Sequence, residues 1–207
     1  FLFGAQPGDE GLAQIETCIA DALGQATEDL EPAEMSYGVV SLDGTHNRRV
    51  TNEEGRSVMV HERTEETTGP VDPQLTALSF ARPSGDIKLV LFHYTAHALT
   101  LGPGNDFFSA DYPGKARRVV EEALPADTAV FLNGAAGNVH PWQCMRSDTE
   151  ALQVIGEAVG AAAVEAVRSA ASAESRPLRL KTERLEFSNR ADPSLVVEVE
   201  IGVMQLG

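Results

Sequence analysis

The sequence predicts an α/β fold in which mixed β-sheets with antiparallel strand pairs are flanked by helices. Two strand-like segments lie on either side of a Pro-Ser-Gly-Asp turn at residues 83–86, and two more alternate near the C-terminus. Three other segments repeat apolar residues at helical spacing. The elements do not follow the regular strand–helix alternation of a Rossmann fold or a barrel, which favours a mixed architecture.

The expected elements follow one another along the chain. Helices are expected at residues 9–25, 111–124 and 148–172. Strands are expected at residues 35–42, 57–61, 75–80, 87–95, 128–132, 178–187 and 195–206. The segment 87–95 is a nearly continuous apolar run, which predicts a strand buried on both faces. Residues 43–73 form a long polar loop around the strand at 57–61, and loops of this length are often functional.

The second expected helix has clear start signals. Asp111 offers a capping side chain, and Pro113 falls in the first turn, where a missing N–H costs nothing. The inward face of this helix is predicted to consist of Ala116, Val119, Val120 and Ala123. The inward face of the next helix is predicted to consist of Leu152, Ile155, Val159, Ala163 and Val167.

Composition excludes several classes of protein. The 207 residues are 43% hydrophobic, which is enough for a core without disulfides or a structural metal. A formal net charge of −15, from 16 basic and 31 acidic residues, disfavours nucleic acid as a partner. No apolar run is long enough to span a bilayer, and Cys18 and Cys144 fit no metal or redox spacing. The chain starts at Phe1 and stops at Gly207 after an apolar alternating run, so we expect a piece of a longer reading frame; compartment and oligomeric state stay open.

Two histidines four residues apart end the 87–95 segment. His93 lies inside the apolar run and is predicted to be a packed, structural histidine. His97 lies where the strand gives way to a loop, the place where ligands gather in α/β proteins. A neutral imidazole there is either an ordinary loop residue or a metal ligand. A zinc site needs about three protein ligands, and no His-Glu-x-x-His or paired-cysteine motif supplies them.

Two further segments carry residues suited to chemistry. Asn-Gly-Ala-Ala-Gly-Asn, residues 133–138, is either a tight turn or the wall of an active site, since it lacks the pattern of a phosphate loop. His140 and Trp142 follow it and are suited to lining a pocket. Arg48 and Arg49 in the long loop are either solvated side chains or donors to a carboxylate or oxyanion.

Taken in order, these segments resemble one family. They are similar to segments of the N-terminal catalytic domain of the neutral/alkaline non-lysosomal ceramidases and their bacterial relatives. The segments that carry the resemblance are, in order, Asn-Arg-Arg, Gly-Pro-Val-Asp-Pro-Gln-Leu, the segment of His97, Ser-Ala-Asp-Tyr-Pro-Gly and Phe-Leu-Asn-Gly-Ala-Ala-Gly-Asn-Val-His-Pro. The resemblance covers about residues 10–207. It implies that residues 1–207 are a single domain, part of a catalytic domain truncated at both ends. It also implies zinc-dependent hydrolysis of the amide bond of ceramide, which gives sphingosine and a fatty acid.

The resemblance assigns roles to particular residues. The family holds its Zn²⁺ with two histidines, a glutamate and a tyrosine, and His97 matches the second histidine. The first histidine is expected upstream of Phe1, and the glutamate and tyrosine after Gly207. Arg48 matches an active-site arginine. The segment 109–114 matches a family segment that borders the same pocket, which implies that Asp111 lies near the metal.

The chain also departs from the family pattern. Where ceramidases have Gly-Asp-Val-Ser-Pro, residues 137–141 have Asn138 for the aspartate and His140 for the catalytic serine. This indicates a divergent bacterial branch. We expect a zinc-dependent amidase in which His97 holds the metal and Arg48 and His140 stabilise the oxyanion or orient the carbonyl of a small-molecule or lipid amide. The alternatives are hydrolysis of a different amide or ester, and a non-catalytic relative on the same fold. The isolated 207 residues are expected to be inactive.

Overall fold

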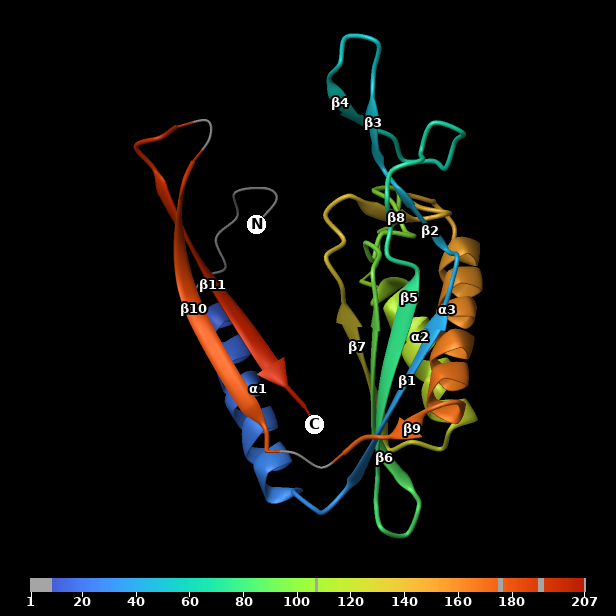
Figure 1. Cartoon of the computed structure of the whole chain (residues 1–207), viewed down its shortest axis with the longest axis vertical. Coiled ribbons are helices and arrows are strands. Elements are labelled where there is room, and N and C mark those ends of the chain that lie inside the picture. Colours follow the sequence, from blue (N-terminus) through green and yellow to red (C-terminus); the bar gives the residue numbers. More distant parts are fainter. Residues whose placement is uncertain (1–8, 107, 175–176, 190–191, 207) are drawn as a thin grey trace. The chain divides into compact units, whose positions relative to one another are not determined.

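The computed structural model describes residues 9–106, 108–174, 177–189 and 192–206. These residues form an α/β fold of mixed sheets with antiparallel pairs and three helices, which confirms the predicted fold class (Figure 1). They fall into two compact units, with the boundary after Ala33.

The first unit consists of helix α1, Asp9–Glu28. It confirms the helix expected at residues 9–25 and continues for one turn more. The apolar stripe of the helix lies on one face, but its side chains are exposed, from 44% for Leu12 to 64% for Leu23. No helix in the described part of the chain is long and apolar enough to cross a membrane.

The second unit is built on a five-stranded sheet. The strands lie in the order β7-β6-β5-β1-β9, where all neighbours are antiparallel except the parallel pair β6 and β7. Their bounds are Glu34–Ser41 for β1, Gln74–Ala81 for β5, Ile87–Tyr94 for β6, Thr128–Asn133 for β7 and Ala171–Ser172 for β9. The predicted hairpin joins β5 to β6 through a turn closed by the Gly85 N–H, which donates to the Arg82 carbonyl at 2.8 Å. Gly85 has φ 94°, a backbone conformation that suits glycine.

Helices α2, Asp111–Ala123, and α3, Glu150–Arg168, cover one face of this sheet. The connection between β6 and β7 runs through α2, which explains why these two strands are parallel. Gly38 in β1 allows α3 to approach closely, since a Cβ there would lie 1.9 Å from the Ala166 carbonyl oxygen. The core between sheet and helices includes Leu75, Val90, Phe92, Tyr94, Tyr112, Ala116, Val120, Val159 and Ala163. Each large apolar side chain buried there stabilises the fold by about 1.5–3 kcal/mol.

The opposite face of the sheet is partly exposed. Tyr37, Val39, Val130 and Leu132 lie on it with exposures between 38% and 49%. Along β6, buried and half-buried residues alternate, so the prediction that this strand is buried on both faces is wrong. The same holds for the expected short buried strand at 128–132, because the helices cover only one side of β7.

The long loop at 43–73 carries three short strands instead of one. Strand β2, Thr45–Asn47, pairs antiparallel with β8, Val139–Pro141. Strand β3, Arg49–Thr51, pairs antiparallel with β4, Ser57–Met59. Of these, only the strand near residues 57–61 was expected from the sequence.

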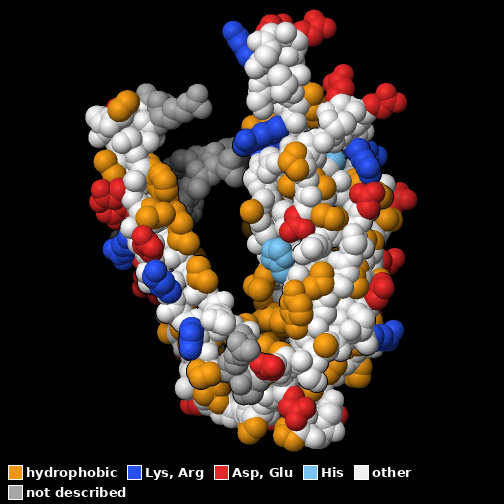
Figure 2. Space-filling view, in the orientation of Figure 1, with side chains coloured by type: hydrophobic (Ala, Val, Ile, Leu, Met, Phe, Trp, Pro, Cys, Tyr) orange, Lys and Arg blue, Asp and Glu red, His pale blue; other side chains and the backbone are white. Residues whose placement is uncertain are grey.

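The C-terminal hairpin confirms the predicted pair of alternating strands. Strands β10, Arg179–Ser188, and β11, Val196–Gln205, pair antiparallel along their whole lengths. Opposed residues share a face, so Phe187 with Val197 and Leu185 with Val199 make one side apolar, while Arg184 with Glu200 makes the other charged. Figure 2 shows hydrophobic side chains along one side of this hairpin and charged ones along the other.

Candidate active site around His140

The site is organised by the β2–β8 ladder. In its register His46 lies directly opposite His140, and the ring centroids are 5.9 Å apart and nearly perpendicular. Both side chains are buried, with 2% of His46 and none of His140 exposed. The ladder is short, but it joins the loop after β1 to the loop after β7, so residues far apart in sequence meet here.

Two more histidines contact His140. The ring of His61 stacks on it with centroids 5.7 Å apart, and the ring of His97 meets it edge-on at 5.4 Å. Four of the five histidines of the chain therefore lie together, with the ring of His140 in contact with the other three. We refer to His46, His61, His97 and His140 as the histidine cluster. The fifth, His93, lies in β6 and lines a separate surface depression with Thr95 and Asn138. His93 is half-buried and lies outside the cluster, so its predicted role as a packed, structural histidine stays a prediction.

Arg48 lies against the cluster. Its Nη1 is 3.0 Å from His140 Nε2, and its Nη2 donates to the Gly137 carbonyl at 3.0 Å. The Arg48 backbone N–H donates to the Asn138 carbonyl at 2.8 Å, which fixes the junction between β2 and β3 to the loop before β8. Among the described residues no carboxylate forms an ion pair with Arg48, so its charge is held by neutral acceptors.

These contacts determine which nitrogen of His140 carries the proton. A guanidinium can only donate, so Nε2 of His140 must accept from Arg48. Nδ1 of a neutral ring then bears the hydrogen, and it faces the sulfur of Cys144 at 3.5 Å. The Cys144 thiol donates in turn to the His61 carbonyl at 2.7 Å. A chain of hydrogen bonds thus runs from His61 through Cys144 and His140 to Arg48.

Burial and nearby cations keep several of these imidazoles neutral. Burial, reinforced by Arg48 and the neighbouring histidines, lowers the pKa of His140 to about 4. Burial also lowers the pKa of His97 and of His46, with smaller contributions from Arg48 and Arg63 respectively. Neutral rings keep a lone pair, which is what a metal or a proton donor requires of them.

Several buried nitrogen atoms in the site have no hydrogen-bond partner among the described residues. They are both ring nitrogens of His46, Nε2 of His97 and Nε of Arg48. A buried polar atom left without a partner costs about 1–3 kcal/mol, so such atoms are rare away from functional sites. Their concentration around His140 makes this cluster the candidate place for a ligand.

The loop after His97 is fixed by Asp111. The Asp111 carboxylate accepts from the Thr100 N–H at 3.1 Å, the Thr100 hydroxyl at 2.6 Å and the Leu101 N–H at 3.0 Å. Asp111 is buried and has φ 52°. The expected capping of α2 by this side chain is met only in part. One oxygen accepts from the Tyr112 N–H at 2.7 Å, but the N-cap position is Ala110, and the other bonds of the carboxylate go to the loop. Asp111 anchors the segment that carries His97.

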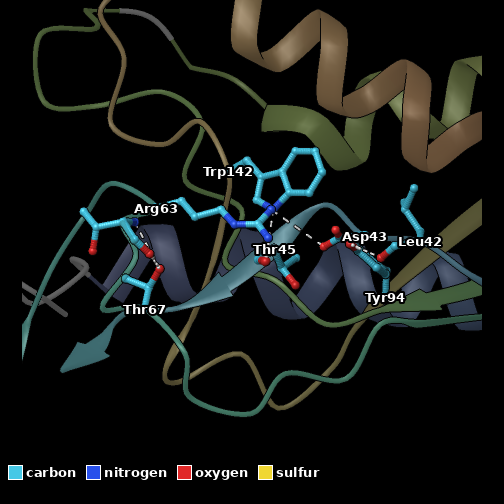
Figure 3. Close-up of polar contacts among 8 residues, drawn as sticks. Leu42, Asp43, Thr45, Arg63, Thr67, Tyr94 and Trp142 are labelled. Carbon is cyan, nitrogen blue, oxygen red and sulfur yellow. Dashed lines mark hydrogen bonds and ion pairs between the residues drawn. The ribbon is translucent and has the colours of Figure 1, made fainter.

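The rim of the site contains a cation on an aromatic ring. Cζ of Arg63 lies 4.7 Å from the centre of the Trp142 ring (Figure 3). The Trp142 Nε1–H donates to the Thr45 carbonyl at 3.1 Å, which ties the ring to the residue before His46. Beside this rim, a depression of about 370 Å³ is lined by His61, Glu62, Cys144, Met145, Arg146, Ser147 and Asp148.

The structure thus brings together Arg48, His97 and His140, the three site residues that the sequence analysis proposed. It adds His46, His61 and Arg63, which sequence reasoning missed. The one available signal was the position of His46 in the same Thr-His-Asn-Arg-Arg segment as Arg48.

The fit of the site to Zn²⁺ is partial. His97 offers a neutral ring with a buried, unpartnered Nε2, which suits a metal ligand. Within the described residues, no group of three or more His, Cys, Asp or Glu side chains is arranged to hold a metal ion. A zinc site here would therefore need ligands in addition to these.

Comparison with known proteins shows what the fold is like. No family model and no curated protein matches the chain. The neutral ceramidase from Pseudomonas aeruginosa matches with a TM-score of 0.60 and 20% sequence identity, over 81% of this chain and 28% of that one. A ceramidase complexed with C2 matches with a TM-score of 0.60 and 20% identity, over 78% of this chain and 26% of that one. The chain thus spans little more than a quarter of each, and at this identity the likeness establishes a ceramidase-like fold.

Proposed function

We propose that the chain belongs to a zinc-dependent hydrolase that cleaves an amide bond, as the ceramidase resemblance implies. The observation that carries the proposal is the meeting of His97 with the Arg48–His140 pair on a ceramidase-like fold. His97 is the residue that the resemblance assigns to zinc, and Arg48 is its active-site arginine. Both bring a buried nitrogen without a partner to the same cluster.

His97 holds the metal in this proposal. Its Nε2 is free, and its lowered pKa keeps the lone pair available near neutral pH. Zinc, when bound, supplies a Lewis acid that activates water and polarises the substrate carbonyl. The Asp111 carboxylate, through Thr100 and Leu101, keeps the His97 loop in place.

Arg48 stabilises the negative charge that develops on the carbonyl oxygen. Two of its nitrogens are already fixed by the Gly137 carbonyl and by His140, so the guanidinium is pre-oriented. Nε is buried and has no partner among the described residues, so in this proposal the substrate oxygen enters the site to reach it. A preorganised donor of this kind is typically worth a hundredfold or more in turnover, by order of magnitude.

His140 orients Arg48 in this arrangement. Its Nε2 is occupied as the acceptor for Arg48 and its Nδ1 faces Cys144, so neither nitrogen is free to attack a substrate or take its proton. His140 stands where the resemblance places a serine in the ceramidases. The chemistry therefore has to proceed without a hydroxyl at this position.

Zinc content tests the proposal most directly. We expect about one zinc per chain in the complete reading frame, measured by elemental analysis after purification without chelators. His97→Ala should lose it, whereas His93→Ala should keep it, because His93 is outside the cluster. Absence of metal from the parent protein, or its retention in His97→Ala, would overturn the proposal and favour a non-catalytic relative.

A second candidate keeps the metal and changes the substrate. His140 in place of the family serine favours it, because the buried ring and its bond to Arg48 reshape the centre of the site. The substrate is then an amide or ester other than ceramide. A panel of N-acyl compounds assayed with the zinc-loaded protein distinguishes the two, since preference for a long-chain N-acyl sphingoid supports the first candidate only.

A further inference from the structure

We propose that Arg63 and Trp142 form a subsite that binds a carboxylate on the headgroup of an acyl-amide substrate. We call these two residues the Arg63–Trp142 shelf. That the ligand is a substrate rests on the proposed function above. The binding of a carboxylate does not depend on that function, and it can be measured without metal or turnover.

The shelf is built from the same segments as the histidine cluster. Arg63 lies two residues after His61, and Trp142 lies two residues after His140. The Trp142 Nε1–H is bonded to the Thr45 carbonyl, so the ring is anchored next to His46 (Figure 3). A ligand held on the shelf therefore lies beside the cluster.

Arg63 is available to a ligand. Its side chain is half exposed, and its ion pair with Asp43 has an Nη1–Oδ1 distance of 3.9 Å, with 71% of the Asp43 side chain exposed. Such a long, solvated ion pair contributes little. The Trp142 ring restrains the guanidinium, and a restrained guanidinium offers two parallel N–H groups that match the two oxygens of a carboxylate.

The charges around the cluster favour an anion. The chain as a whole has a formal net charge of −15, yet the cations Arg48 and Arg63 both lie at this site. Arg48 has no carboxylate partner among the described residues. Both ring nitrogens of His46 are buried without a well-formed hydrogen bond, and the pKa of that ring is lowered by burial and, to a smaller extent, by Arg63. The acidic groups that face the site include Asp43 at the shelf, and Glu62 and Asp148 in the depression beside it. A carboxylate on the ligand would supply the counter-charge that Arg48 lacks and that Arg63 has only in the solvated Asp43 carboxylate.

Trp142 provides the measurement, because it is the only tryptophan of the chain. We would titrate the chelator-treated protein with N-octanoylglycine and with N-octanoylglycinamide, which differ only in the carboxylate, and follow tryptophan fluorescence. The carboxylate compound should bind about tenfold more tightly, as expected for one charge-assisted, two-point contact. Equal affinity for the two compounds overturns the proposal.

Variants assign the effect to the shelf. Arg63→Gln should abolish the preference for the carboxylate, Arg63→Lys should keep part of it, and Asp43→Asn should increase it because a competing carboxylate is removed. Arg49→Gln is the matched control, since Arg49 is an exposed arginine of β3 outside the shelf, and it should bind as the parent does. Unchanged circular dichroism and melting temperature confirm that the variants are folded. A preference that survives in Arg63→Gln overturns the proposal.

The binding experiment and the zinc experiment fail independently. If the metal-free protein prefers N-octanoylglycine through Arg63 but the complete protein holds no zinc, the shelf is established and the hydrolase proposal is wrong. If the protein holds zinc and hydrolyses amides without preferring the carboxylate, the shelf proposal is wrong and the hydrolase remains.

Discussion

His46 and His140 face each other across the β2–β8 ladder at 5.9 Å, yet their hydrogen-bonding situations are opposite. His140 uses both ring nitrogens, toward Arg48 and Cys144. Neither ring nitrogen of His46 has a well-formed hydrogen bond within the described residues, and only the His61 backbone is near enough to raise the pKa of the ring. The His140 ring therefore contributes hydrogen bonds to the structure of the site, whereas the His46 ring contributes none that is well formed.

Replacing His46 with leucine should not destabilise the protein. A buried polar group without a partner costs about 1–3 kcal/mol, and an apolar side chain of similar size avoids that cost. We expect the free energy of unfolding in urea to stay the same or rise by about 1 kcal/mol. His140→Leu is the contrasting variant and should lose about 1.5–3 kcal/mol, because it removes the acceptor for Arg48. Strong destabilisation by His46→Leu would mean that this ring has a structural role.

The protein should lose stability when the Asp111 carboxylate is removed. Asp111→Ala leaves the Thr100 and Leu101 N–H groups without an acceptor and puts an alanine at φ 52°, so we expect a loss on the order of 3 kcal/mol. Asp111→Asn should cost clearly less, because asparagine keeps one acceptor and tolerates this backbone conformation. Equal losses in the two variants, measured by urea unfolding, would contradict the anchoring role.

Alkaline pH should unfold the protein through its buried tyrosines. Burial raises the pKa of Tyr94 from 10.0 to about 12 and raises that of Tyr112 further. A raised folded pKa means that the stabilisation is complete below pH 10 and is lost as the pH rises above it. Tyr112→Phe should be slightly less stable at neutral pH, since the bond to the Ala96 carbonyl is lost, but its stability should fall less steeply above pH 10. Denaturant unfolding followed across this pH range checks both parts.

Acidic pH should also lower the free energy of unfolding, in this case through the histidine cluster. The pKa of His140 is lowered from 6.5 to about 4, so the unfolded chain takes up its proton first. The stabilisation from the neutral ring is present above pH 6.5 and is lost as the pH falls towards 4. His140→Gln keeps an acceptor for Arg48 but cannot titrate. Its free energy of unfolding should therefore fall less than that of the parent over this range, and parallel curves would contradict the assignment.

The parts of the fold that the sequence predicted are those with local signals. The β5–β6 hairpin has a turn motif between two apolar runs, and the C-terminal hairpin has strict alternation. The apolar run of β6 was misread because two-sided burial depends on whether a second layer covers the sheet, and periodicity does not record that. Asp111 has the residue type of a helix cap, but the Thr100 segment competes for its oxygens, and no local pattern reveals this.

The candidate site was predictable only in part for the same reason. His97, Arg48 and His140 were singled out from their position after strands and from a resemblance, and their catalytic roles stay predictions. His61 was missed because it lies in the loop just after β4, where no local pattern marks it. His46 was missed because it joins the site through the pairing of β2 with β8, which are three residues each and are too short to leave a periodic pattern. The pairing of these strands is a tertiary event that neither segment encodes alone.

That pairing has a consequence for how the protein folds. Arg48 and His140 are 92 residues apart in the chain, and the ladder that brings them together has only three residue pairs. Closing so long a loop costs conformational entropy, which the short ladder alone does not offset. We expect the candidate site to assemble late, after the sheet and its helices have formed, and to open before they do. Amide hydrogens of β2 and β8 should then exchange with solvent through local openings, well before those of β5 and β6.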